Sequence, residues 1–131
     1  MKFYELRSGQ RTVTATTDTW TSESIQGAVK KIEYIVSGTM NVKANSLRED
    51  GSTADEYLTG GVSASLSCPT GKTNCYPVRH NTAISDNSAY VEGTNADASR
   101  CPVVINSPVQ VTGTLTSTTS GTWEAIVTYE K

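Results

Sequence analysis

Three cysteines and one histidine are the residues with the greatest potential for chemistry in this sequence. Cys68 and Cys75 bracket a polar turn. If that turn closes a hairpin, their thiols could form a disulfide that contributes about 2–3 kcal/mol. Free thiols that pack as small hydrophobic groups are the alternative. Adding Cys101 and His80 gives the donor types of a zinc site, but no C-x2-C pair accompanies them, so the sequence does not favour a metal.

No catalytic motif accompanies these residues. The sequence contains no G-x-S-x-G nucleophile elbow, no H-E-x-x-H metal motif and no C-x-x-C redox pair. A histidine that packs in the core or faces solvent is a better interpretation of His80 than a general base. We therefore predict a protein that is not an enzyme and that has no catalytic residue, cofactor or metal ion.

Aromatic side chains are the second group that could bind a partner. Trp20, Tyr57 and Tyr90 fall in segments with the composition of loops. An exposed ring there could stack on a glycan or contact a protein partner. Packing at the margin of the core is the default expectation for each of these rings.

Charge and hydropathy exclude two classes of partner. Eleven basic and 13 acidic residues give a net charge of −2, whereas nucleic-acid binding needs a concentrated basic surface. No stretch approaches the roughly 20 apolar residues of a membrane-spanning helix. The N-terminus also lacks the apolar core of a secretory signal. We expect neither a nucleic acid nor a membrane as partner.

The composition and the hydropathy pattern indicate β-structure. The chain holds 20 threonines and 15 serines, and β-branched threonine suits an exposed strand face. Residues 32–44 alternate strictly between apolar even positions and mostly polar odd positions. This period of two predicts one long strand with one face in the core. Gly38, at its middle, is a natural place for a bulge or a sharp twist.

Shorter patterns predict the remaining strands. The two clearest are a strand over residues 61–68 and a C-terminal hairpin, whose strands begin at Val109 and Thr122 and are joined by a turn over residues 118–121. Weaker patterns suggest a return strand at residues 76–84 and further strands at residues 3–7 and 12–17.

Residues 22–30 are the one ambiguous segment. Ile25, Val29 and Ile32 fit the stripe of an amphipathic helix as well as a strand, and Ser22 could cap such a helix. Gly27 weakens the helical alternative by roughly 1 kcal/mol relative to alanine. Both readings stay open for this segment.

About six to eight strands separated by turns rich in glycine, serine and asparagine predict an all-β fold. We expect an antiparallel β-sandwich, a jelly roll or a small barrel. Residues 1–131 would form a single β domain, whose first residues could extend as a short arm.

In its size and general character the chain resembles the small β-rich decoration (cement) proteins of tailed-bacteriophage capsids. The features that carry this resemblance are the short length, the initial Met1, the near-neutral charge, the long strand and the potential arms at both ends. The resemblance implies a virion protein, made in the host cytoplasm, that oligomerises on a capsid shell and stabilises it. Its partners would be other copies of itself and a major capsid protein. A carbohydrate-binding β-sandwich and a phage tail or fibre component are the alternatives.

Overall fold

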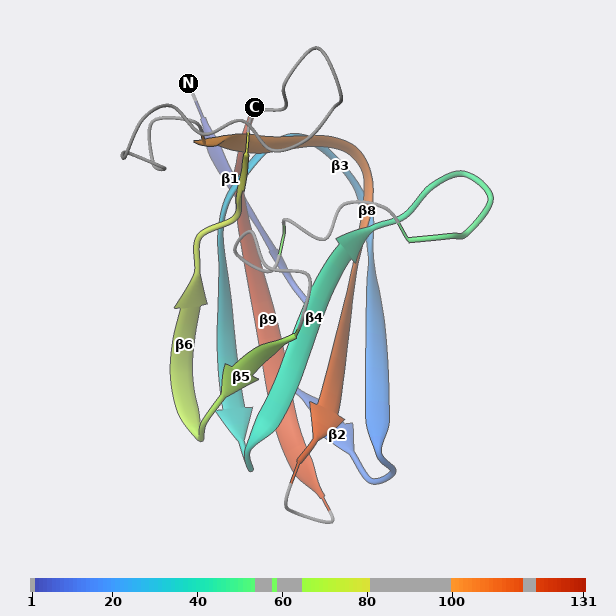
Figure 1. Ribbon diagram of the computed structural model, residues 1–131, viewed down its shortest axis with the longest axis vertical. Coiled ribbons are helices and arrows are strands. Elements are labelled where there is room, and N and C mark those ends of the chain that lie inside the picture. The colour runs from blue at the N-terminus through green and yellow to red at the C-terminus, as the bar shows by residue number, and fades with distance from the viewer. Residues whose placement is uncertain (1, 54–57, 59–64, 81–99, 117–119) are drawn as a thin grey trace.

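The computed structural model describes residues 2–53, 58, 65–80, 100–116 and 120–131, and every described strand pairing is antiparallel (Figure 1). The strands are β1 (Phe3–Arg7), β2 (Arg11–Val13), β3 (Thr17–Ser37), β4 (Met40–Ser46), β5 (Leu66–Cys68), β6 (Gly71–Cys75), β7 (Val78–His80), β8 (Arg100–Leu115) and β9 (Gly121–Glu130). They pair in the order β1-β9-β3-β8-β4-β5, with β2 beside β9, β6 beside β3 and β7 beside β8. The predicted all-β antiparallel fold is confirmed, with nine described strands instead of six to eight.

Strand β3 organises the sheet because its neighbours change along its 21 residues. Its first part, Thr17–Val29, pairs with β8. Its last part pairs with β9 over Ala28–Ser37 and with β6 over Ile32–Val36 on the opposite edge. Figure 1 shows β3 rising, bending over the top of the molecule and descending, with β8 following the bend. The sheet therefore curls into a half-barrel around one core.

The ambiguous segment at residues 22–30 is strand throughout, so the helical alternative is wrong. Ile25, Val29 and Ile32 are all fully buried, at spacings of four and three residues. The pairing of β3 shifts register twice in this region, first against β8 and then against β9. Each irregularity moves the inward face of the strand by one residue. The step of four from Ile25 to Val29 is that of a regular strand, because the first bulge precedes Ile25. The bulge between Val29 and Lys31 produces the step of three from Val29 to Ile32, and the two steps together resemble a helix.

Ser22 stabilises the first of these bulges, which lies between Thr21 and Ser24. The Ser22 hydroxyl oxygen accepts a hydrogen bond of 2.9 Å from the backbone N–H of Val109. Pro108, which pairs with Ser24, has no N–H to offer the ladder. The side chain that could have capped a helix thus satisfies a backbone donor at a break in the ladder.

The predicted single strand over residues 32–44 is in fact two strands. β3 ends at Ser37 and β4 starts at Met40, and no described ladder joins the two. Gly38 turns the chain with a φ of 88°, and its N–H donates to the Thr70 hydroxyl at 3.0 Å. The even-numbered apolar residues are buried on both sides of this turn. Because the alternation keeps its phase across the turn, the sequence pattern does not reveal it.

The C-terminal strands lie where they were predicted, but they do not form a hairpin. β8 and β9 pair with β3 along different parts of its length, and β3 stands between them in the sheet order. β8 also begins at Arg100, well before the predicted start at Val109. Of the predicted turn over residues 118–121, residues 118 and 119 lie outside the described residues, and Gly121 is already the first residue of β9.

The other strand predictions are confirmed in part. Residues 3–7 form β1, whereas the segment at 12–17 is interrupted: its first two residues end β2, residues 14–16 are not strand, and Thr17 begins β3. The turn between the two cysteines is short, because Gly71–Cys75 is strand β6. β5 and β7 are the described parts of the strands predicted over 61–68 and 76–84, and residues 61–64 and 81–84 lie outside the description.

The core lies inside the half-barrel and is built from the inward side chains of β3, β4, β8 and β9. Its largest fully buried side chains are those of Trp123, Tyr34, Ile25, Ile32, Met40 and Leu58. Tyr34 is unusual among them because its hydroxyl is buried and has no hydrogen-bond partner among the described residues. Burial raises the pKa of this phenol well above its ordinary value, so the hydroxyl stays protonated.

We predict that Tyr34→Phe stabilises the protein by about 1 kcal/mol, because it removes a buried polar group that makes no hydrogen bond and keeps the ring. Urea unfolding of the two proteins, compared at the same pH, measures this difference. A loss of stability in the variant would contradict the prediction.

Candidate functional site

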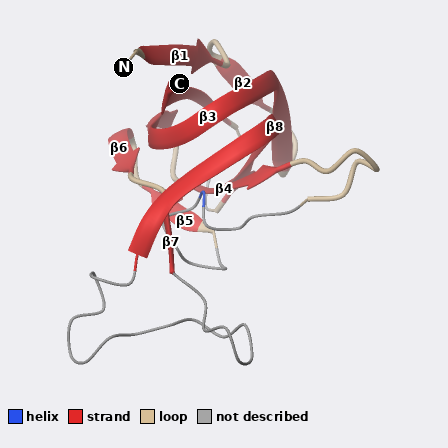
Figure 2. Ribbon diagram, turned by 90° about the horizontal axis from the view of Figure 1, so that it is seen from above, coloured by secondary structure: helices blue, strands red, loops and turns tan. Residues whose placement is uncertain are grey.

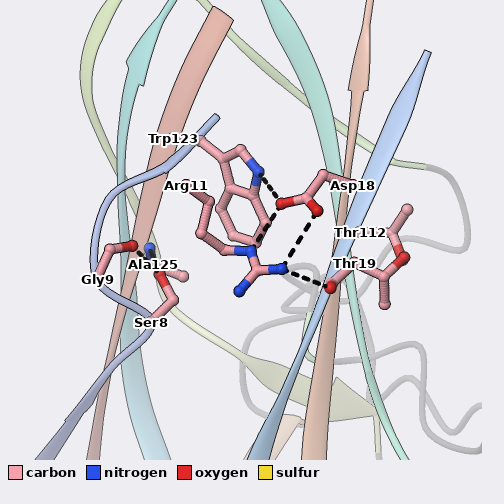
Figure 3. Close-up of polar contacts among 8 residues, drawn as sticks. All are labelled: Ser8, Gly9, Arg11, Asp18, Thr19, Thr112, Trp123 and Ala125. Atoms are coloured by element: carbon pink, nitrogen blue, oxygen red, sulfur yellow. Dashed lines mark hydrogen bonds and ion pairs between the residues drawn. The ribbon is translucent and has the colours of Figure 1, made fainter. Parts of the chain in front are cut away.

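Arg11, Asp18 and Trp123 form the best-connected polar cluster in the described part of the chain (Figure 3). Arg11 binds the carboxylate through two hydrogen bonds, from Nε to Oδ2 at 2.7 Å and from Nη2 to Oδ1 at 3.2 Å. The Trp123 Nε1 donates to the same Oδ2 at 3.1 Å. The guanidinium carbon lies 5.8 Å from the indole centroid, within the range of a cation–π contact.

Three separate strands supply this cluster. Arg11 opens β2 and is paired with Trp123 of β9, while Asp18 is the second residue of β3. Arg11 also donates to the backbone carbonyl of Thr19 at 3.1 Å. The cluster therefore fastens the start of β3 to the β2–β9 pair.

The polar groups of this cluster are already paired with one another. The hydrogen bonds from Arg11, helped by its charge and by Trp123, hold the pKa of the Asp18 carboxyl below its ordinary value. A carboxylate whose oxygens already accept three hydrogen bonds is a poor general base and a poor metal ligand. The arrangement suits a structural role, in which it fixes how the strands meet.

Sequence reasoning did not identify Arg11 and Asp18 as partners, although one signal was present. They are the only charged residues between Ser8 and Ser22, and they have opposite signs. A reversal of the chain between them would bring these two isolated charges together. Trp123 could not have been added from the sequence, because 105 positions separate it from Asp18.

We predict that Asp18→Asn destabilises the protein by about 1–2 kcal/mol at neutral pH, because it removes a charge-assisted, bidentate pair. A carboxyl whose pKa is lowered by folding contributes its full stability above its unfolded pKa of about 3.9. That contribution is lost as the pH falls through the lower pKa of the folded state. The difference between the wild type and the variant should therefore shrink below about pH 4.

Urea unfolding at several pH values measures this difference. Glu5→Gln is the control, because the Glu5–Arg7 pair is more than half exposed and such pairs contribute little. A gap between wild type and Asp18→Asn that does not change with pH would contradict the assignment.

Cys68 and Cys75 lie buried at the ends of β5 and β6, and both are free thiols in the structure. The Cys75 Sγ donates to the Leu58 carbonyl oxygen at 3.5 Å. Burial raises the pKa of Cys75 to about 11, and it also raises the pKa of Cys68. The structure thus has the packed thiols of the alternative interpretation, and the disulfide is not formed in it.

The zinc alternative lies partly outside the described residues. His80 and Cys101 belong to the paired strands β7 and β8, but the description does not extend to their side chains. Among the described residues, no group of three or more His, Cys, Asp or Glu side chains is placed to hold a metal ion. The described part of the chain also contains no helix with the length and apolarity needed to cross a membrane.

We predict that Cys68 and Cys75 react very slowly with iodoacetamide in the native protein. At pH 8 the Cys75 thiol, with its pKa of about 11, is ionised in roughly one molecule in a thousand. Burial also raises the pKa of Cys68 and keeps the reagent away from both thiols. In denaturant without reductant, three thiols per chain should be alkylated, as counted by intact mass. A count of one would mean that two cysteines are joined in a disulfide.

The aromatic residues predicted to contact a partner are placed differently from one another. Trp20 is in β3, not in a loop, and its half-buried ring packs against the core opposite Val111. Tyr57 and Tyr90 lie outside the described residues. A glycan or partner contact by any of the three stays a prediction. The large apolar side chains that are exposed in the described part of the chain are Phe3, Tyr4, Ile35, Tyr76 and Val104.

No protein-family model and no curated protein matches this sequence. Solved structures with a weak similarity to this chain include two that match almost all of it. One is a structure of infectious bursal disease virus, Gx strain, with 9% identity and a TM-score of 0.35. The match covers 98% of this chain, and this chain spans about a third (32%) of the length of the viral chain. The other is a 60-mer of the BFDV capsid protein, with 13% identity, a TM-score of 0.36, and coverage of 98% of this chain and 91% of that one. Similarity at this level assigns the chain to no family.

Proposed function

We propose that this protein is a non-enzymatic structural component of a virus particle, and that it acts as a decoration (cement) protein. In this role it binds a capsid shell together with other copies of itself and stabilises the shell. The observation that carries the proposal is the edge strand β1, which presents open backbone and exposed aromatic side chains. Both are suited to contact with another protein.

Strand β1 lies at the end of the sheet order, and in the described part of the chain it pairs only with β9. Seen from above, it runs along the outer margin of the molecule (Figure 2). Phe3 is 61% exposed, and Tyr4 stacks on Tyr129 with its ring centroid 5.5 Å away. An open edge of this kind is a template for pairing with a further chain.

The pairing of Asp18 and the burial of the described thiols support a structural role over a catalytic one. Asp18 is neutralised by Arg11, and the two described thiols are buried. Among the described residues, Asp18 is thus used to hold strands together, and Cys68 and Cys75 help to fill the core. What the described part of the protein offers to a partner is its surface.

Two measurements test the proposal. Virus particles purified on a density gradient from the source culture should contain this protein in many copies, as measured by quantitative mass spectrometry. Particles stripped of it should lose their genome at a lower temperature and regain heat resistance when the purified protein is added back. Absence from the purified particles, or stripped particles with unchanged heat resistance, would overturn the decoration role.

A further inference from the structure

The backbone N–H and C=O groups of β1 alternate along the strand between its partner β9 and the opposite edge, which no described strand occupies. The Lys131 N–H donates to the Lys2 carbonyl at 3.2 Å, and at the other end the Ser8 N–H donates to the Ala125 carbonyl at 2.9 Å. In an antiparallel ladder, alternate residues of a strand bond to the same neighbour. The even-numbered residues of β1 therefore bond to β9. Those that direct N–H and C=O groups to the free edge are Phe3, Glu5 and Arg7.

The charged side chains on this edge are placed so that two copies of β1 can bring opposite charges together. Glu5 and Arg7 stand on the same face of β1, on either side of Leu6, and their side chains are 52% and 58% exposed. If a second β1 lies antiparallel with its Leu6 opposite the first Leu6, each Glu5 faces an Arg7 of the other copy. Both residues present their backbone to the free edge, so each such pair is also joined by backbone hydrogen bonds.

We infer that β1 pairs with β1 of a second copy around a two-fold axis at Leu6, so that the two sheets become continuous. Glu5 then leaves its present contact with Arg7 of its own strand, at 3.0 Å, for the Arg7 of the other copy. This inference rests on the proposed function and names the surface through which copies associate.

Other pairings are less favourable. A two-fold axis at Glu5 would place two carboxylates directly opposite each other, which is destabilising. On the other side of the sheet, strand β6 also lacks a second partner among the described residues. Its only charged residue is Lys72, so two copies of β6 have no opposite charges to align. The second copy is therefore expected at β1.

A charge-swap experiment tests this pairing. Glu5→Arg gives an edge with two positive charges, and Arg7→Glu gives one with two negative charges. Each variant alone should dimerise roughly tenfold more weakly than the wild type, because the cross-strand pairs become repulsive. An equimolar mixture of the two should form heterodimers at least as well as the wild type forms homodimers. Neither variant has a complementary pair within its own strand, so only pairing between copies can restore association in the mixture.

Sedimentation velocity from about 10 µM to about 1 mM covers the weak association expected of such a small interface. Thermal unfolding of each variant confirms that it is folded. Glu49→Arg, in an exposed segment away from β1, is the control and should dimerise like the wild type.

The possible failures are distinguishable. A wild type that dimerises while the mixture behaves like the separate variants would overturn pairing at β1 and leave the virion role standing. A wild type that is monomeric at all concentrations would overturn the β1 pairing too. The virion role itself is judged by the particle measurements above, which do not depend on dimerisation in solution.

Discussion

Gly27→Ala is expected to destabilise the protein by about 3 kcal/mol or more, through a combination of overpacking and backbone strain. Gly27 lies at the bend of β3, where the chain leaves β8 for β9, with a φ of 147°. A Cβ atom at this position would lie 2.3 Å from the backbone carbonyl oxygen of Glu130. Backbone cannot move aside like a flexible side chain, so β3 and the end of β9 would have to separate.

Gly9→Ala is the matched control for this substitution. Gly9 also has a positive φ, of 72°, but an added Cβ would meet nothing within 4 Å. Its cost should be limited to the conformational strain of about 1 kcal/mol. Urea unfolding of both variants, with circular dichroism to verify that they are folded, gives the comparison. Equal losses at the two glycines would show that the close approach at Gly27 has no special effect.

Trp123→Ala is expected to lower the free energy of unfolding by about 3–5 kcal/mol, because it removes the largest buried side chain and leaves a cavity in the core. Its indole N–H also donates to Asp18 and its ring faces Arg11. Trp123→Phe separates these roles, since it retains an aromatic ring and removes the donor. We expect a loss of about 1–2 kcal/mol for this conservative change.

Trp20→Ala is the comparison for Trp123→Ala, because Trp20 also packs on the core but is only half-buried. Its loss should be clearly the smaller of the two. A double-mutant cycle that combines Trp123→Phe with Asp18→Asn would measure the coupling across the 3.1 Å hydrogen bond. Strictly additive losses would contradict a direct interaction between the two side chains.

Local patterns in the sequence were sufficient to predict an all-β fold and the inward face of its clearest strands. The even-numbered apolar residues from Ile32 to Ala44 are buried as the alternation indicated, because an extended backbone directs successive side chains to opposite faces whatever its neighbours are. The same reasoning correctly placed Val109, Val111, Trp123, Ala125 and Val127 in the core.

The pattern failed where the strand geometry departs from regularity. The turn at Gly38 preserves the phase of the alternation, so one strand and two strands give the same sequence pattern. The bulge of β3 between Val29 and Lys31 shifts the phase instead, and buried residues at spacings of four and then three resemble a helix. In both cases the deciding contacts come from distant residues: Thr70 at the turn, and Thr128 and Tyr129 of β9 at the bulge.

In the candidate site, too, the sequence showed the residue types and the tertiary structure decided their contacts. The residue types were visible in the sequence, since it contains the isolated charges of Arg11 and Asp18, the cysteines and the exposed β1 charges. Tertiary structure alone decided that Asp18 meets Trp123, that Cys68 and Cys75 are packed as free thiols, and that β1 has β9 as its only partner among the described strands. The backbone's period of two is a local property and can be read from neighbouring residues. Which strands become neighbours depends on how the whole set of apolar faces packs into one core, and no local segment contains that information.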